Sequence, residues 1–174
     1  MNKRTKKTVS LNEALARARK YCALSERSRA EVMRKLEELG VMKGDLQVLL
    51  EKLTNEGFLN EKRFATAFAG GKFRMKKWGR NRIKMEMKKK GLSQELISRG
   101  LSELPEKEYT ATLDKLLTKK WQTLQRKAAR HFSLSAEEGT KQYISLLRYA
   151  LQKGYEQELV MQRIKKLDII LNNK

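Results

Sequence analysis

The side chains that could carry chemistry in this sequence are cations, and they crowd into one stretch. Residues 72–90 hold ten lysines and arginines against one acid, Glu86. A helix that only has to be soluble mixes its charges, because like charges three or four residues apart repel by roughly a few tenths of a kcal/mol. We therefore predict a docking surface for an anionic partner here, although a solvated helix face is the plainer alternative. The predicted binding residues of this stretch are Lys72, Arg74, Lys76, Lys77, Arg80, Arg82, Lys84, Lys88, Lys89 and Lys90.

No residue pattern in the sequence predicts catalysis or a bound metal. Cys22 is the only cysteine and His131 the only histidine, so neither a disulfide nor a cysteine zinc cluster can form within the chain. Cys22 falls on the apolar side of a predicted helix, where a small core residue is expected. The sequence contains no P-loop, no Gly-x-Ser-x-Gly and no HExxH motif. We therefore expect a protein that is not an enzyme and that needs no cofactor.

The composition indicates the class of protein and of partner. The chain has 174 residues, of which 40% are apolar and 34% charged, as in folded soluble domains. Its formal net charge of +20 disfavours the compact state but speeds encounters with nucleic acid or an acidic protein. No apolar run reaches the roughly 20 residues that cross a bilayer, and the basic start lacks the apolar segment of a signal peptide. We expect a cytoplasmic, monomeric protein with an anionic partner and no membrane contact.

We expect helices to carry these cations, because apolar residues recur at helical spacing throughout the chain and predict helices there. Residues 46–53, for example, place four leucines on one helix face. Ser28 followed three residues later by Glu31 predicts a capping box at the start of another helix. The pair Gly70-Gly71 predicts a bend or an early end of its helix, since each glycine costs about 1 kcal/mol relative to alanine. No stretch alternates with period two, so the predicted class is all-α with about nine helices.

Three glycines mark an internal repeat. With Gly40, Gly91 and Gly154 in register, apolar residues coincide four and eight residues before each glycine and one, six, ten and thirteen after it. Each unit is predicted as a helix, a tight corner at glycine and a second helix, preceded by a more variable helix. Units of this size bury their apolar faces only by stacking on neighbours. We therefore predict an elongated, slightly curved array of three tandem three-helix repeats, over residues 11–55, 56–104 and 105–174, after a basic disordered arm at residues 1–10.

Two motifs support a family resemblance. Residues 57–65 read GFLNEKRFA, and they are followed by GRNRI at 79–83 and by KKGL at 89–92. This run resembles the central repeat of the RecX family of RecA regulators. Residues 28–41, which begin SRAE and end GV, are similar to the first repeat of that family. The resemblance covers roughly residues 24–104, and the third unit is similar only in its apolar pattern.

The resemblance implies a non-catalytic protein that binds the filament of RecA on single-stranded DNA and lies along its helical groove. Such a protein inhibits ATP hydrolysis and strand exchange by RecA, and so acts on homologous recombination, DNA repair and the SOS response. The resemblance adds Arg63 to the predicted binding residues and emphasises Arg80, Arg82 and Lys84. The sequence departs from the family where Asn60 replaces the usual Asp and where the third repeat lacks basic residues at several turns.

Direct binding to DNA or RNA is the alternative function. A helix, a glycine corner and a second helix, as over residues 28–53, also describe a helix-turn-helix reader of the major groove. The second of these helices is not basic, which argues against such a reader, but we still expect single-stranded DNA as a direct, weaker partner. Trp78 could stack on a base or anchor a corner between two helices, and a corner needs a large anchor. Further cations gather late in the chain at Lys119, Lys120, Arg126, Lys127 and Arg130.

Overall fold

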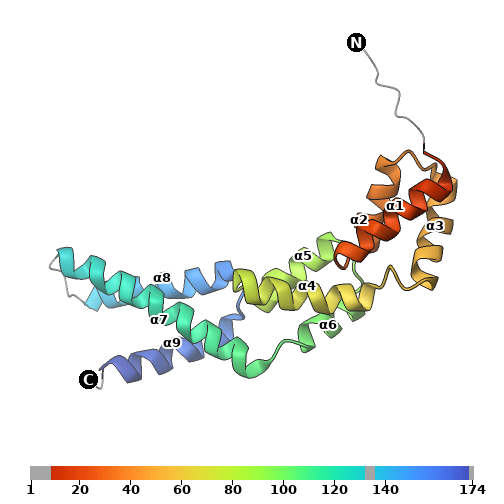
Figure 1. The fold of residues 1–174 in the computed structure, drawn as a ribbon. Coiled ribbons are helices and arrows are strands. Elements are labelled where there is room, and N and C mark those ends of the chain that lie inside the picture. The colour runs from red at the N-terminus through yellow and green to blue at the C-terminus, as the bar shows by residue number, and fades with distance from the viewer. Residues whose placement is uncertain (1–8, 132–135, 173–174) are drawn as a thin grey trace, which may run out of the picture. The chain divides into compact units, whose positions relative to one another are not determined.

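The computed structural model describes residues 9–131 and 136–172, and helices make up most of them (Figure 1). The basic arm predicted for residues 1–10 therefore lies outside the described residues except for Val9 and Ser10, as does the side chain of His131. The helices are α1 (Leu11–Leu24), α2 (Arg29–Glu38), α3 (Lys43–Asn55), α4 (Glu61–Lys76), α5 (Arg80–Lys89), α6 (Gln94–Ser102), α7 (Glu106–His131), α8 (Ala136–Lys153) and α9 (Gln157–Asn172).

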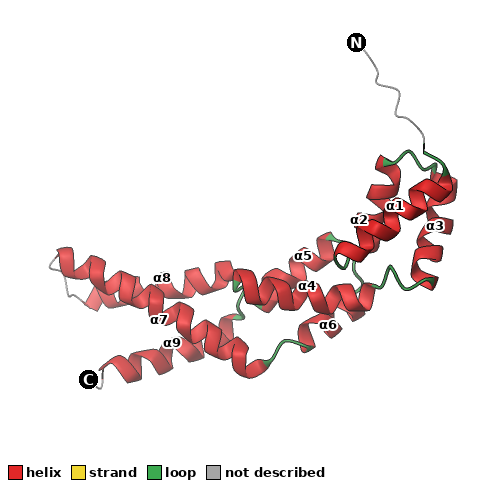
Figure 2. Ribbon diagram, viewed as in Figure 1, coloured by secondary structure: helices red, strands yellow, loops and turns green. Residues whose placement is uncertain are grey.

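The predicted all-α class is confirmed, because no strand occurs in the two described ranges (Figure 2). Helix α4 differs from one expectation: it does not end at Gly70-Gly71 but continues to Lys76. Ala69 and Phe73 are buried on either side of the glycine pair, and their burial outweighs the weak helix propensity of the two glycines. Across the part of the chain that the structure describes, no helix combines the length and the apolarity needed to cross a membrane.

The helix corner predicted from the aligned glycines is built in the same way three times. Gly40, Gly91 and Gly154 have φ angles of 85°, 80° and 91°, in the left-handed region that glycine adopts without steric cost. At each corner the residue after the glycine donates its amide hydrogen bond to the carbonyl of the residue four positions before the glycine. This bond closes the preceding helix. The sequence repeat is therefore present in the backbone. The three bonds are Val41 to Leu36 (3.1 Å), Leu92 to Met87 (3.3 Å) and Tyr155 to Ala150 (3.1 Å).

The described chain divides into two compact units, and the first takes Met1–Gly70 and Glu86–Leu101. Helices α1, α2 and α3 pack pairwise in it around a core that includes Leu36, Leu50 and Leu53. Cys22 belongs to this core, as predicted, and burial raises the pKa of its thiol. Helix α2 begins at the predicted capping box, in which Ser28 Oγ accepts a hydrogen bond from the amide of Glu31 and the Glu31 carboxylate accepts one from the amide of Ser28.

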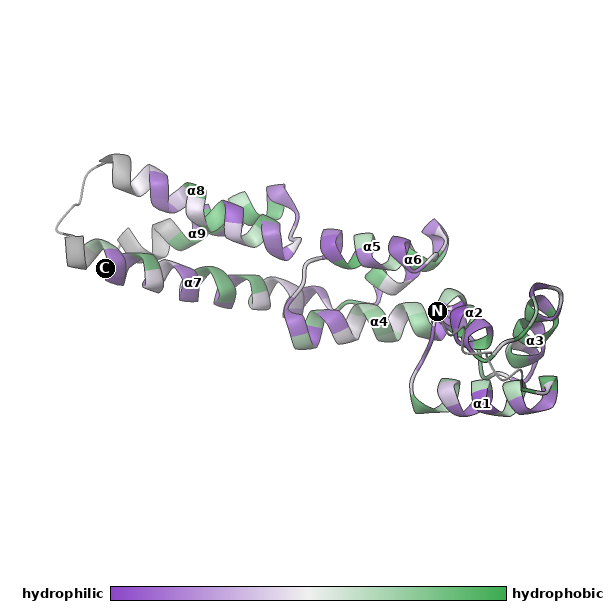
Figure 3. Cartoon of the chain, turned by 90° about the horizontal axis from the view of Figure 1, so that it is seen from above, coloured by the Kyte–Doolittle hydropathy of each residue, from purple (hydrophilic) through white to green (hydrophobic). Residues whose placement is uncertain are grey.

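The second unit takes Gly71–Met85 and Ser102–Lys174. Helices α7, α8 and α9 pack against one another in it, and the hydropathy colouring shows apolar and polar residues alternating along α7 (Figure 3). Tyr109 and Tyr155 are fully buried at its centre. The ring of Tyr109 lies 5.0 Å from that of Tyr155 and 5.6 Å from that of Phe73, between ring centroids.

Within the second unit, the turn before α5 contacts the corner between α8 and α9 through backbone atoms. The amide of Gly79 donates to the carbonyl of Lys153 at 2.8 Å, and the amide of Asn81 donates to the carbonyl of Gly154 at 2.9 Å. A Cβ atom on Gly79 would lie 2.3 Å from the carbonyl carbon and oxygen of Gly154. Glycine at position 79 is therefore required by the closeness of the two backbones.

Candidate partner-binding surface

The eleven predicted binding residues are divided between the two units. Arg63 and Lys88–Lys90 belong to the first unit, and the seven cations from Lys72 to Lys84 belong to the second. The surroundings of these eleven side chains differ. Some of them make ion pairs with described carboxylates of the protein, and others make none with the described residues.

Arg80 lies in a network of internal contacts in the second unit. Its guanidinium donates to Glu106 at 2.5 Å and to Glu156 at 3.3 Å, and it stacks on the ring of Tyr109 with 4.1 Å between the guanidinium carbon and the ring centroid. The Tyr109 hydroxyl accepts a hydrogen bond from the amide of Arg80 and donates one to Glu156. The network connects the starts of α5, α7 and α9, so Arg80 stabilises the fold here.

The pKa shifts in this network follow from burial and from these hydrogen bonds. Partial burial opposes the charged form of Arg80, but the bonds to Glu106 and Glu156 outweigh it and raise the pKa of its guanidinium. Burial, and then the hydrogen bond to Glu156, raise the pKa of the Tyr109 hydroxyl. Arg80 and Tyr109 therefore both keep their protons throughout the physiological range.

Arg82 and Trp78 contact each other in the same unit. The guanidinium carbon of Arg82 lies 4.3 Å from the centroid of the Trp78 ring, and the ammonium nitrogen of Lys72 lies 5.4 Å from the same centroid. Arg82 also donates a hydrogen bond to the carbonyl of Gln152 at 3.1 Å. Trp78 is half-buried, and its ring contacts two cations of the protein itself.

In the first unit, three of the four predicted cations have internal partners. Arg63 donates to Glu26 and to the carbonyl of Gly57, both at 2.8 Å. Lys90 donates to the Glu31 carboxylate at 2.6 Å and faces the rings of Phe64 and Phe68. Lys89 pairs with Glu86 at 2.8 Å on the same helix. Only Lys88 of this group makes no ion pair with another described residue.

The contact between Lys90 and Glu31 predicts a pH-dependent contribution to stability. Burial would raise the pKa of Glu31, but the hydrogen bonds from Lys90 and Ser28 outweigh it and lower that pKa. The contribution is therefore present above the ordinary glutamate pKa of about 4.3 and is lost as the pH falls through the lowered value. We expect Glu31→Gln, which keeps the cap acceptor, to reduce the free energy of unfolding by about 1 kcal/mol at pH 7.

Urea unfolding of the wild type and the variant between pH 7 and pH 3 measures this contribution. The difference between them should stay constant down to about pH 5 and shrink below about pH 4.3. The control is Glu38→Gln, which removes an exposed carboxylate paired with Lys35 on the same helix and should change little. An equal loss in both variants, or a difference that survives at low pH, would contradict the assigned role of Glu31.

Five predicted binding residues make no ion pair with another described residue, and we call them the open cations. Four of them are exposed and Lys84 is half-buried. None makes an ion pair within the described ranges of the chain, so an anion can bind them without displacing a carboxylate of the protein. Four of the open cations belong to the second unit and Lys88 belongs to the first. They are Arg74, Lys76, Lys77, Lys84 and Lys88.

The division between open and internally paired cations could not be found from sequence. Arg80 pairs with Glu106 and Glu156, which lie 26 and 76 residues later in the chain. No periodic pattern in the sequence predicts ion pairs between residues so far apart. The signal for the structural role of the turn was Gly79, because an isolated glycine before a helix can mark a close approach of two backbones.

Comparison with known proteins shows that the region of the predicted cations matches a known protein domain. A model of the second three-helix domain of RecX matches residues 60–101. A protein named Regulatory protein RecX, from Clostridium perfringens, is 28% identical over 137 residues, which cover 79% of this chain and 60% of that protein. A protein of the same name from Pseudomonas fluorescens is 30% identical over 138 residues, which cover 79% of this chain and 81% of that protein.

Solved structures share the fold. The crystal structure of RecX from Lactobacillus salivarius matches with a TM-score of 0.75 at 21% identity, over 91% of this chain and 96% of that one. A second RecX crystal structure matches with a TM-score of 0.71 at 15% identity. At these identities the likeness concerns the fold. The chain spans 57% to 65% of the length of four of the matched relatives, from Clostridium perfringens, Clostridium tetani and Lactobacillus johnsonii.

Proposed function

The chain belongs to the RecX family of regulatory proteins, and from this premise we propose that it binds the filament of RecA on single-stranded DNA and inhibits ATP hydrolysis by RecA. Inhibition of strand exchange, and so of recombination, DNA repair and the SOS response, would follow from the same binding. We further propose that the protein acts in the cytoplasm as a monomer, without catalysis of its own, and that its repeats occupy residues 11–55, 56–104 and 105–174.

The observation that carries this proposal is the position of the open cations. All five lie within the residues that match the second three-helix domain of RecX, and none is paired within the described residues. A filament of protein and single-stranded DNA presents phosphates and carboxylates, to which these side chains are complementary. Arg63, Arg80, Arg82 and Lys90, which are held by the fold, support the helices that carry the open cations.

The test is ATP hydrolysis by a RecA recombinase on single-stranded DNA, with this protein titrated from far below to equal stoichiometry. We expect inhibition, because a protein bound along the filament opposes the rearrangements that turnover requires. Inhibition at ratios well below one would indicate action at filament ends, whereas inhibition only near one-to-one would indicate coating of the groove. The absence of inhibition at equal stoichiometry would overturn the proposal.

A binding measurement separates this function from its alternative. A filament regulator should bind RecA-coated DNA more tightly than it binds RecA or DNA alone. A protein that acts directly on nucleic acid should bind bare single strands equally well with or without RecA, with an affinity that falls with salt by a slope of about 0.7 per phosphate contact. Tight, salt-sensitive binding to bare DNA without inhibition of RecA would favour this alternative.

A further inference from the structure

Helix α7 carries an excess of cations in its second half. Residues 115–131 contain six lysines and arginines and no acid. The buried face of the helix is apolar and includes Tyr109, Leu113 and Leu117. Like charges one turn apart destabilise a helix, so a folding role does not account for the excess.

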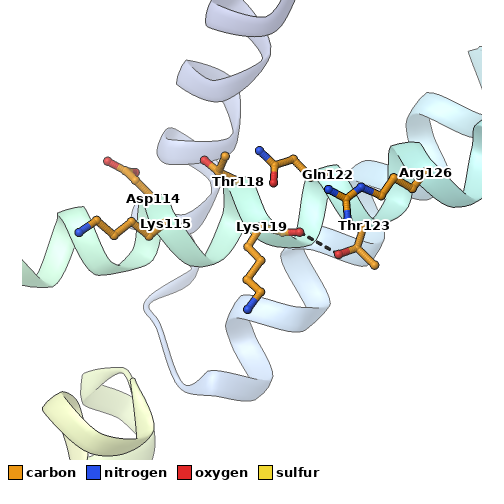
Figure 4. Close-up of a pocket in the computed structure, with 7 residues that line it drawn as sticks. All are labelled: Asp114, Lys115, Thr118, Lys119, Gln122, Thr123 and Arg126. Carbon is orange, nitrogen blue, oxygen red and sulfur yellow. Dashed lines mark hydrogen bonds between the residues drawn. The ribbon is translucent and has the colours of Figure 1, made fainter.

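Three of these cations form a stripe along one exposed face of α7. Lys115, Lys119 and Arg126 are spaced by four and seven residues, which places them on the same side of a helix. Together with Thr118 and Gln122 they line an open hollow of about 540 Å³ in the second unit (Figure 4). We call Lys115, Lys119 and Arg126 the α7 cation stripe.

The single carboxylate at the edge of this hollow is already neutralised. Asp114 accepts two hydrogen bonds from the guanidinium of Arg163 on α9, and its Oδ1 lies 2.7 Å from Arg163 Nε. The hydrogen bond to Asp114 raises the pKa of Arg163, so the guanidinium keeps its charge. The charge that the hollow presents to solvent is therefore that of the α7 cation stripe.

The members of the stripe are exposed and have no ionic partner. Lys115, Lys119 and Arg126 make no ion pair with any residue of the described ranges. Arg80, by contrast, would have to leave two carboxylates before it could bind an external anion. An anion that binds the stripe displaces only water and counterions.

The spacing and chemistry of the stripe fit a chain of phosphates. At 1.5 Å per residue, Lys115 and Lys119 are about 6 Å apart along the helix axis and Arg126 lies about 16 Å from Lys115. A nucleic-acid strand carries a uniform negative charge along such a length, and hydroxyl and amide side chains such as Thr118 and Gln122 donate hydrogen bonds to phosphate oxygens. None of the described residues that line the hollow is aromatic, so base stacking is not part of the proposed site.

We propose that the α7 cation stripe binds the phosphate backbone of single-stranded nucleic acid irrespective of base sequence. The inference extends the expectation that single-stranded DNA is a direct partner, because it assigns that partner a site on a different helix from the open cations. This binding requires no RecA. Binding should release counterions, so the affinity should fall with salt concentration and the slope should report the number of phosphates contacted.

The experiment measures binding to fluorescein-labelled oligo(dT) by anisotropy between roughly 50 and 200 mM salt, with the full chain and without RecA. The test variant is K115Q/K119Q/R126Q, in which glutamine keeps a high helix propensity. The control variant is K20Q/K43Q/K52Q, which removes the same charge from exposed positions on α1 and α3. Circular dichroism during heating confirms that both variants fold.

We expect the salt slope of the test variant to be smaller than that of the wild type by about 2, which is three phosphate contacts at 0.7 each. The slope of the control variant should stay within about 0.5 of the wild-type value. An unchanged slope in the test variant, or equal reductions in both, would overturn the proposal. Poly-glutamate serves as a probe for an acidic protein partner. If the test variant loses binding to poly-glutamate but still binds oligo(dT) like the wild type, the proposal is also overturned, in favour of an acidic protein partner. The outcome is independent of the filament experiment, because RecA is absent.

Discussion

Replacing Gly79 with alanine is expected to destabilise the second unit by about 3 kcal/mol. The added Cβ would lie 2.3 Å from the carbonyl of Gly154 and from the amide nitrogen of Tyr155. Backbone atoms cannot rotate aside as a flexible side chain can, so the two segments must separate. Overpacking of this kind costs roughly 1–3 kcal/mol, and the hydrogen bonds from Gly79 and Asn81 across the contact contribute about 1 kcal/mol each.

Thermal unfolding measures the effect, and Gly71→Ala is the matched control. A Cβ on Gly71 meets no atom within 4 Å, and the residue lies inside helix α4, where alanine is favoured over glycine by about 1 kcal/mol. We therefore expect the melting temperature to fall by about 6–12 °C for Gly79→Ala and to rise slightly for Gly71→Ala. Equal melting temperatures for Gly79→Ala and the wild type would show that the backbones are not in close contact.

Reversing three open cations, in the variant K76E/K84E/K88E, is expected to weaken binding to the RecA filament by at least about 100-fold. A pair of unit charges at contact in water is worth about 1 kcal/mol, and reversal replaces attraction by repulsion of similar size at each position. Screening by salt reduces the total of about 6 kcal/mol, and about 3 kcal/mol suffices for a 100-fold change. Sedimentation with RecA-coated DNA measures the affinity.

The control for this variant is K20E/K43E/K52E, which changes the net charge of the protein by the same amount at exposed positions in the first unit. Both variants should unfold within a few degrees of the wild type, because none of the six lysines makes an ion pair within the described part of the chain. Equal weakening in both would mean that net charge, rather than the position of the open cations, determines binding. Arg80→Glu is unsuitable for this purpose, since it places a third carboxylate beside Glu106 and Glu156.

Features that depend on neighbours in the chain could be predicted from the sequence. The capping box at Ser28 spans four residues, and the corners at Gly40, Gly91 and Gly154 repeat one short pattern, so both were found by spacing alone. The apolar positions in register with these glycines, such as Leu36 and Met87, lie in the core. The stretch of cations was also found, because charge is a property of composition.

Features that depend on distant partners could not be predicted. A lysine or arginine looks the same in a sequence whether it faces solvent or a carboxylate, so Lys84 and Arg80 were indistinguishable. The structure separates them by bringing Glu106 and Glu156 to Arg80 and none of the described carboxylates to Lys84. Of the bend or early end predicted at Gly70-Gly71, the early end was wrong, because local propensity was weighed without the burial of Ala69 and Phe73.

The contact of Arg80 with Glu156, 76 residues later in the chain, affects how the second unit folds during synthesis on the ribosome. At roughly 5–20 residues per second, translation needs about 4–15 s to proceed from one partner to the other. Arg80 and, once it has been made, Tyr109 must wait through this interval without Glu156 and Tyr155, which they contact in the finished second unit. A nascent chain that stalls before the codons of α9 would keep them uncovered, as a substrate for chaperones and proteases.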